Sequence, residues 1–176
     1  MFTVPVIIIT GPIGVGKTTV AGEVSEQLDE AKIAHGCIDI DSLRWCYPRP
    51  PHDPFRIELA MKNLTAVWRN FQAVGAERLV LADVIETRAH LEQYYRAIPG
   101  AEILVVRLHA TLSTLTQHVQ QREIGSALTR HLQRATELTA IMERNRVEDM
   151  LVDIEEKTVT AIAQEILIRS NWIPAN

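Results

Sequence analysis

The fold is decided by one stretch of the chain, Gly11-Pro12-Ile13-Gly14-Val15-Gly16-Lys17-Thr18, which satisfies the pattern G-x-x-x-x-G-K-[ST] in full. Its glycines let the backbone curl so that successive N–H groups point inward at an anion. Lys17 supplies a cation for the terminal phosphates, and the hydroxyl of Thr18 can ligate Mg²⁺. The stretch therefore predicts a phosphate-binding loop for a nucleoside triphosphate.

The residues on either side of the loop support this interpretation. Val4 to Thr10 is a short β-branched run that predicts a strand. A helix is expected from Lys17, with Val20, Val24 and Leu28 spaced so that they form one apolar stripe. A helix that begins at the loop adds its N-terminal dipole to the attraction for phosphate. A strand, a glycine loop and a helix in this order argue against an ordinary glycine-rich turn.

Further apolar runs predict the rest of a parallel sheet. Four more strands are expected over residues 36–41, 78–82, 102–108 and 150–154. Runs of this kind, without polar alternation, are typical of strands that are buried on both faces. Helices are expected between the strands, among them one from Asp53, as its cap, to Gly75, and a last one over residues 158–169. The alternation predicts an α/β fold with right-handed crossovers.

Length and composition place the chain among ordinary globular proteins. It has 176 residues, 47% of them hydrophobic and 23% charged, so we expect one domain over residues 1–176. A net charge of −4 gives no basic field to attract nucleic acid or an anionic membrane. The chain shows no export signal, and its two cysteines form no disulfide framework. We therefore expect a cytoplasmic protein, a monomer or homodimer, with small-molecule partners.

Several segments carry a resemblance to a known family. Strand two ends in Asp39-Ile40-Asp41-Ser42-Leu43, which is similar to the D-x-D of shikimate kinase and the D-S-L segment of chloramphenicol phosphotransferase. Leu79 to Val84 resembles the Walker B position, and Gln121-Arg122-Glu123 falls where the family's lid begins. Val152-Asp153 resembles the V-D-T element that contacts adenine, although Ile154 stands in place of the threonine. The chain thus resembles, over nearly its whole length, the P-loop small-molecule kinases that act on gluconate, shikimate, adenylylsulfate and chloramphenicol.

The resemblance implies both a fold and an activity. The fold would be a three-layer α/β/α P-loop domain with a five-stranded parallel sheet in the order 2-3-1-4-5. The activity would be transfer of the γ-phosphoryl group of Mg·ATP to a hydroxyl of a small molecule. Such a transfer needs a carboxylate beside the acceptor, Mg²⁺ at the β- and γ-oxygens, and cations over the equatorial oxygens.

These requirements give roles to residues at the carboxyl ends of the strands, where a doubly wound sheet places its ligands. Asp41 is expected to be the general base or to orient the acceptor, and Asp39 is expected on the same face of the strand. Asp83 is expected to hold Mg²⁺ together with Thr18. Lys17, Asp41 and Arg130 are the expected catalytic residues.

A lid over residues of about 120–135 is expected to close on ATP and exclude water. It has a Gly125-Ser126 hinge, Arg122 for stacking on adenine, and Arg130 and Arg134 for the phosphates. The residues expected to bind the nucleotide are Gly11, Pro12, Ile13, Gly14, Val15, Gly16, Lys17, Thr18, Thr19, Arg122 and Asp153.

The acceptor-binding region is expected over residues of about 42–75. The residues expected to contact the substrate are Asp39, Asp41, Arg44, Arg56 and Arg88, with Trp45, Tyr47 and Arg49 as further candidates. Aromatic rings beside arginines can hold a ring or an anionic group, so the sequence leaves the acceptor open.

Two other functions stay open at this point. A nucleoside monophosphate kinase would leave Asp41 without a role, because a phosphate acceptor needs no base. A regulatory module that binds a nucleoside triphosphate without an acceptor is the third possibility. Against it, the sequence has no N-K-x-D guanine-specificity motif.

Overall fold

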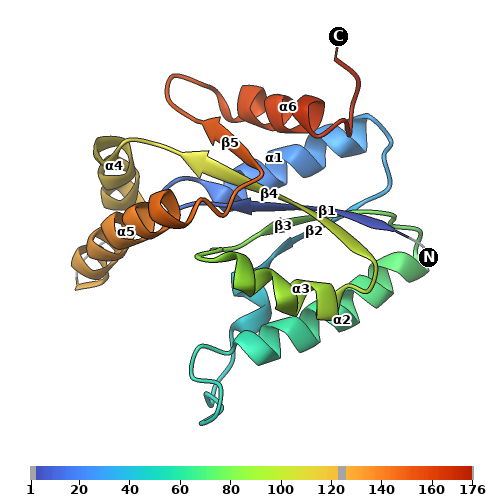
Figure 1. Ribbon diagram of the computed structural model, residues 1–176, viewed down its shortest axis with the longest axis horizontal. Coiled ribbons are helices and arrows are strands. Elements are labelled where there is room, and N and C mark those ends of the chain that lie inside the picture. Colours follow the sequence, from blue (N-terminus) through green and yellow to red (C-terminus); the bar gives the residue numbers. More distant parts are fainter. Residues whose placement is uncertain (1–2, 123–125, 176) are drawn as a thin grey trace.

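The computed structural model describes residues 3–122 and 126–175. Its centre is a five-stranded sheet in which all neighbouring strands run parallel, in the order β2-β3-β1-β4-β5 (Figure 1). The strands are β1 (Val4–Thr10), β2 (Gly36–Asp39), β3 (Leu79–Ala82), β4 (Ala101–His109) and β5 (Met150–Asp153). The predicted α/β fold and the strand order 2-3-1-4-5 are both confirmed.

Helices cover the two faces of this sheet. They are α1 (Lys17–Glu30), α2 (Ile57–Ala73), α3 (Leu91–Ala97), α4 (Leu112–Arg122), α5 (Ser126–Asn145) and α6 (Val159–Arg169), with short 3₁₀ helices η1 (Ile40–Arg44) and η2 (Arg88–His90). In Figure 1, α1 and α6 lie against one face and α2 and α3 against the other. The central strand β1 supplies both cores, because successive side chains of a strand point to opposite faces. Ile7 and Ile9 pack on the α1/α6 side, and Ile8 packs on the α2/α3 side.

The parallel arrangement brings the ends of β1, β2 and β3 to one edge of the sheet. β1 pairs with β3 on one side and with β4 on the other. The chain therefore leaves β1 at the position where the strand order reverses, which is where open α/β sheets bind ligands. The phosphate-binding loop, residues 11–18, lies at this position.

The second strand is shorter than the sequence suggested. It ends at Asp39, and Asp41 lies in the 3₁₀ helix η1. The carboxylate of Asp39 accepts a 2.9 Å hydrogen bond from the Asp41 N–H and so caps η1. Asp39 and Asp41 therefore do not share a face of one strand, because the chain turns between them.

The helix that was expected from Asp53 to Gly75 also begins later than expected. It begins at Ile57, and Arg56 precedes it in the left-handed conformation, with φ 56°. Asp53 still caps the helix, from four residues upstream, because its carboxylate accepts hydrogen bonds from the N–H groups of Ile57 (2.8 Å) and Leu59 (3.1 Å). Within the described residues, every helix is too short or too polar to span a bilayer.

Candidate active site

The phosphate-binding loop is closely packed around Gly14. Gly14 has φ 87°, and a Cβ atom there would lie 2.8 Å from Cγ2 of Val119 and 3.0 Å from the carbonyl oxygen of Leu115. Only glycine fits this approach, since L-residues rarely adopt such a φ and the neighbouring backbone cannot move aside. Lys17 lies over the loop, where its Nζ donates to the carbonyls of Gly11 (3.0 Å) and Pro12 (3.2 Å). The side-chain cation is thus held against the backbone of the loop that is expected to bind phosphate.

Helix α4 forms one wall beside the loop. The imidazole Nδ1 of His118 lies 2.9 Å from the carbonyl oxygen of Gly14 and donates its proton to it. Together with the Gly14 packing, this contact fixes the loop against α4. The role of His118 could not be found from the sequence, because nothing in its spacing connects it with residue 14.

A cavity of about 460 Å³ opens next to the loop, on the side of α4 and α6. It is lined by Gly14, Val15, Gly16, Thr19, Val20, Thr114, His118, Ile154, Glu155, Glu156, Lys157, Val159 and Ile162. Its position and size fit the nucleoside part of a nucleotide whose phosphates lie on the loop. Asp153, which was expected to bind the nucleotide, does not line the cavity, whereas the next residue, Ile154, does.

Asp153 and Glu155 instead shape the segment between β5 and α6. The carboxylate of Asp153 accepts a 2.9 Å hydrogen bond from the Glu155 N–H. Glu155 accepts from the N–H of Thr111 (2.8 Å) and from the hydroxyl of Thr114 (3.1 Å). These bonds lower the pKa of Glu155 and tie the segment to the start of α4.

The metal-binding candidates are separated by the structure. The hydroxyl of Thr18 donates a 2.6 Å hydrogen bond to Oδ2 of Asp39. Asp83 contacts Arg44 and Tyr94 instead. Hydroxyl and carboxylate oxygens are the ligands that Mg²⁺ takes in proteins. The described contacts therefore favour Asp39 as the partner of Thr18 at a metal site.

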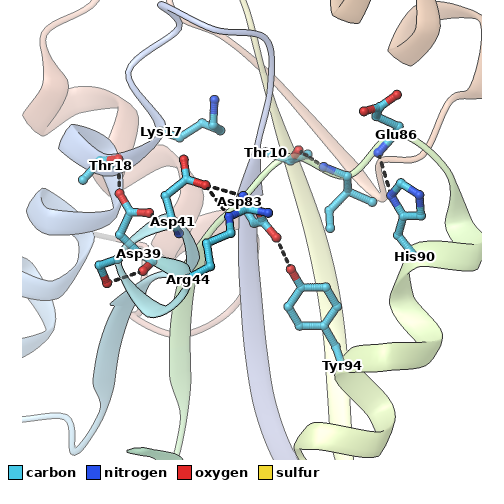
Figure 2. A network of polar contacts seen from close by, with 12 residues as sticks. Thr10, Lys17, Thr18, Asp39, Asp41, Arg44, Asp83, Glu86, His90 and Tyr94 are labelled. Carbon is cyan, nitrogen blue, oxygen red and sulfur yellow. Dashed lines mark hydrogen bonds and ion pairs between the residues drawn. The ribbon is translucent and has the colours of Figure 1, made fainter. Parts of the chain in front are cut away.

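Asp41, Arg44, Asp83 and Tyr94 form a chain of polar contacts at the same edge (Figure 2). Arg44 donates from Nε (2.8 Å) and from Nη2 to Oδ1 of Asp41. Its Nη2 also lies 3.3 Å from Oδ1 of Asp83. Oδ2 of Asp83 accepts a hydrogen bond from the hydroxyl of Tyr94. The Asp41 side chain is 64% exposed and that of Asp83 only 9%. Asp41 is thus the carboxylate that a ligand can reach, whereas the buried Asp83 binds Arg44 and Tyr94.

Burial changes the acidity of the inner members of this chain. It raises the pKa of Asp83, although hydrogen bonds from Tyr94 and from the Val84 N–H, together with the charge of Arg44, oppose the rise. Burial also raises the pKa of Tyr94 well above its ordinary value, and the adjacent Asp83 adds to the shift. Tyr94 therefore keeps its proton and acts as a hydrogen-bond donor.

The candidate arginines have different surroundings. Arg56 donates a 3.1 Å hydrogen bond to the Cys46 carbonyl, and Arg88 is paired with Asp149. Arg134 on α5 is paired with Glu86, which follows β3. Arg130 is exposed on α5.

Part of the expected lid lies outside the described residues. Gly125 of the proposed hinge is among the undescribed positions, and the side chains of Arg122 and Ser126 are not described either. The lid therefore stays a prediction. Trp45 and Tyr47, expected near the acceptor, are 85% and 94% exposed in the loop after η1.

A second cavity lies apart from these residues. It has a volume of about 500 Å³ between α2 and α3, and it is lined by His52, Asp53, Ile57, Glu58, Met61, Lys62, Thr65, Gln93, Arg96 and Ala97. None of the individually named substrate residues lines it, but seven of its lining residues, from His52 to Thr65, fall within the expected acceptor-binding region of about 42–75.

Comparison with known proteins places this geometry in a family. Residues 7–150 match the family described as an AAA domain (AAA_18). Comparison with curated proteins finds no match.

Solved structures with the same fold include several small-molecule kinases. A gluconokinase from Sinorhizobium meliloti 1021 is 20% identical with a TM-score of 0.61, covering 96% of this chain and 94% of its own. A shikimate kinase from Acinetobacter baumannii in complex with shikimate is 20% identical with a TM-score of 0.59, covering 98% and 97%. The Deinococcus radiodurans tunicamycin resistance protein is 17% identical with a TM-score of 0.62, covering 95% of each chain.

Proposed function

Because the chain belongs to the AAA domain family of P-loop proteins, we propose that it is a kinase that transfers the γ-phosphoryl group of ATP to a hydroxyl of a small molecule. The observation that carries the proposal is the position of Asp41. Its exposed carboxylate lies in η1, directly after β2, at the edge of the sheet that also holds the phosphate-binding loop. A carboxylate in this place can orient an acceptor hydroxyl and take its proton.

One oxygen of Asp41 is available for the acceptor. Arg44 binds Oδ1 through two N–H groups, and among the described residues no hydrogen bond is made to Oδ2, which can accept one from an incoming hydroxyl. In this position Asp41 orients the hydroxyl and takes its proton as the bond to phosphorus forms. The Arg44 contact keeps the carboxylate in one orientation.

The loop residues bind the other substrate. The N–H groups of the loop and Lys17 hold the phosphates, and Arg130 is the cation of α5 proposed to approach the transferred group. Thr18 and Asp39 fit Mg²⁺ because their oxygens are already 2.6 Å apart at the end of the loop. Mg²⁺ held by these two residues would supply positive charge that favours phosphoryl transfer.

The gluconokinase and shikimate kinase that share the fold support this proposal by analogy, since both names describe phosphorylation of a small hydroxyl compound.

The test is ADP release from ATP with and without a panel of alcohols, sugars and nucleotides. A hydroxyl compound that accelerates ADP release, with a phosphate ester as product, supports the proposal. A nucleoside monophosphate as the best acceptor would make the protein a nucleotide kinase. Tight binding of ATP without acceleration by any acceptor would indicate a regulatory module.

A further inference from the structure

Two arginines near the ends of β2 and β3 are already bound by carboxylates of the chain itself: Arg44, expected at the acceptor, and Arg134, expected to reach the phosphates. Arg44 contacts Asp41 and Asp83, and its side chain is only 22% exposed. Arg134 contacts Glu86 on one side and Glu137 on the other. A guanidinium that is held by two carboxylates has little positive potential left for a third anion.

The remaining arginines expected at the substrate, Arg56 and Arg88, also have partners within the chain. Arg56 donates to a backbone carbonyl, and Arg88 is paired with Asp149, which precedes β5. Among the residues that the structure describes, neither Arg49 nor Arg56 has a carboxylate partner, and Arg49 is exposed. A solvated cation attracts an anion only weakly.

Acidic groups are in excess along this edge. Figure 2 shows four carboxylates near the ends of β2 and β3, those of Asp39, Asp41, Asp83 and Glu86, together with the cations of Lys17 and Arg44; Arg134 pairs with Glu86. The outermost of the four is Asp41, the residue proposed to meet the acceptor. An acceptor with its own carboxylate, sulfate or phosphate would approach this group against a like charge.

We infer that the acceptor is a neutral or cationic alcohol, and that the carboxylate-bound arginines exclude anionic acceptors; the inference rests on the proposed kinase function. In the reaction, the acceptor oxygen forms a bond to the γ-phosphorus while the bond to the ADP oxygen breaks. The hydroxyl proton passes to Asp41 and then to solvent, so the products are ADP, a phosphate monoester and one proton. Juxtaposed like charges in such a site cost several kcal/mol, which corresponds to a loss of at least ~100-fold in kcat/KM.

The first test compares acceptors that share a carbon skeleton and differ in the charge of the group at one end. One triplet is gluconate, sorbitol and N-methylglucamine, and another is phenyllactate, 3-phenylpropane-1,2-diol and 1-amino-3-phenylpropan-2-ol. The second triplet carries a ring because the loop after Arg44 exposes Trp45 and Tyr47. We expect the neutral or cationic member to accelerate ADP release above the rate of ATP hydrolysis without an acceptor. The kcat/KM for the anionic member should be at least ~100-fold lower. An anionic member that is the best of its triplet overturns the inference.

The second test does not depend on turnover. The Nε resonances of Arg44 and Arg134 are followed by NMR while inorganic sulfate is added to the protein with Mg²⁺ and a non-hydrolysable ATP analogue. Unchanged resonances at constant ionic strength support the inference, and a saturable shift overturns it. If no acceptor is phosphorylated although the nucleotide binds, the proposed function fails, and this titration decides the charge selectivity by itself.

A pair of variants tests the cause of the selectivity. Glu86→Gln removes the inner partner of Arg134, whereas the control Glu137→Gln removes one charge as well but leaves the Glu86 contact in place. Glu86→Gln is expected to make the Arg134 Nε resonance shift saturably with sulfate. It is also expected to raise kcat/KM for the anionic member of a triplet by about 10-fold relative to that for the neutral member. If Glu86→Gln behaves like the control, carboxylate pairing is not the cause and the inference is wrong.

Discussion

The hydroxyl of Thr18 lies 2.6 Å from Oδ2 of Asp39 and donates a hydrogen bond to it, although the two residues come from different elements of the fold. Thr18 is in the first turn of α1, and Asp39 is the last residue of β2. The contact joins the phosphate-binding loop to the strand that leads to Asp41. It also makes Asp39, rather than the more buried Asp83, the carboxylate in contact with the hydroxyl of Thr18.

Asp39→Asn is therefore expected to weaken the binding of Mg·ATP. The amide keeps a carbonyl acceptor for the Asp41 N–H but loses the charge that attracts Mg²⁺, so the Mg²⁺ concentration needed for half-maximal ATP binding should rise by about 10-fold. The measurement is a Mg²⁺ titration of ATP binding by calorimetry. Asp83→Asn is the comparison, and a larger Mg²⁺ effect in that variant would restore the sequence-based assignment of the metal to Asp83.

Lys17→Ala is expected to abolish phosphoryl transfer and leave the fold intact. The Lys17 ammonium contacts carbonyls of the loop and lies outside both hydrophobic cores, so its loss removes charge from the phosphates without opening a cavity. ADP release and thermal unfolding are measured on the same preparation. Near-normal turnover in this variant would contradict the assignment of the loop.

Gly14→Ala is expected to damage nucleotide binding through packing. The added Cβ would meet Val119 and the Leu115 carbonyl at 2.8 and 3.0 Å, at a φ of 87° that alanine rarely adopts. We expect destabilisation by about 2 kcal/mol and ATP binding weaker by at least ~10-fold. Thermal unfolding measures the change in stability, and calorimetry measures the change in ATP affinity.

The matched control is Gly22→Ala in α1, where no atom lies within 4 Å of the new Cβ. This variant should keep nucleotide affinity and gain about 0.5–1 kcal/mol of stability, because alanine is the better helix former. Equal behaviour of the two variants would show that the contact between Gly14 and α4 is unimportant.

Much of the fold was predictable because its signals are local. The glycine loop specifies a strand before it and a helix after it, and the apolar runs of β1 and β3 are the residues that the structure buries on both faces. The strand order came from the resemblance to small-molecule kinases and is confirmed. The end of β2 was misjudged because it depends on one side chain, Asp39, which caps η1 and stops the strand.

The site was predictable in its residue types but not in its contacts. Asp83 and Tyr94 are eleven residues apart, and their hydrogen bond exists only because α3 packs back on the sheet. The pairing of Arg88 with Asp149 spans 61 positions and depends on the placement of β5 beside β4. No spacing rule in the sequence shows which arginines are free for a substrate and which are already paired.

Asp53 gives a prediction about stability and pH. Desolvation opposes ionisation of Asp53, but hydrogen bonds from the N–H groups of Leu59, Ile57 and Glu58 outweigh it and lower its pKa. A carboxyl whose pKa is lower in the folded than in the unfolded protein stabilises the fold above the unfolded value, and that stability is lost as the pH falls through the folded pKa. Asp53→Asn is thus expected to lower the Tm by about 2–4 °C at neutral pH.

The difference in Tm between the unmodified protein and the Asp53→Asn variant should shrink when the pH falls below the ordinary pKa of 3.8 for an aspartate. Thermal unfolding of both across the acid range measures this. A difference that stays constant with pH would mean that the charge of Asp53 does not contribute and that only the shape of the cap matters.

Asp41→Asn decides between an alcohol kinase and a protein that only binds a nucleotide. The asparagine keeps the shape of Asp41 and an acceptor oxygen for Arg44, but it cannot take a proton from a hydroxyl. ATP affinity should change little, because phosphate binding depends on residues 11–18, whereas turnover with an acceptor should fall by about 10²–10⁴-fold. Asp29→Asn is the control, since it removes the same charge from an exposed position of α1.

Two other results would give Asp41 a different role. If Asp41 mainly anchors Mg²⁺, ATP affinity falls together with turnover, and added Mg²⁺ partly restores both. If neither quantity changes, Asp41 is only a surface carboxylate of η1, and the proposed transfer to a hydroxyl loses its base. Calorimetry of Mg·ATP binding and ADP release with an acceptor, measured side by side on the Asp41→Asn and Asp29→Asn variants, separate the three outcomes. We expect the first, because Arg44 holds one oxygen of Asp41 while Asp39, not Asp41, contacts Thr18.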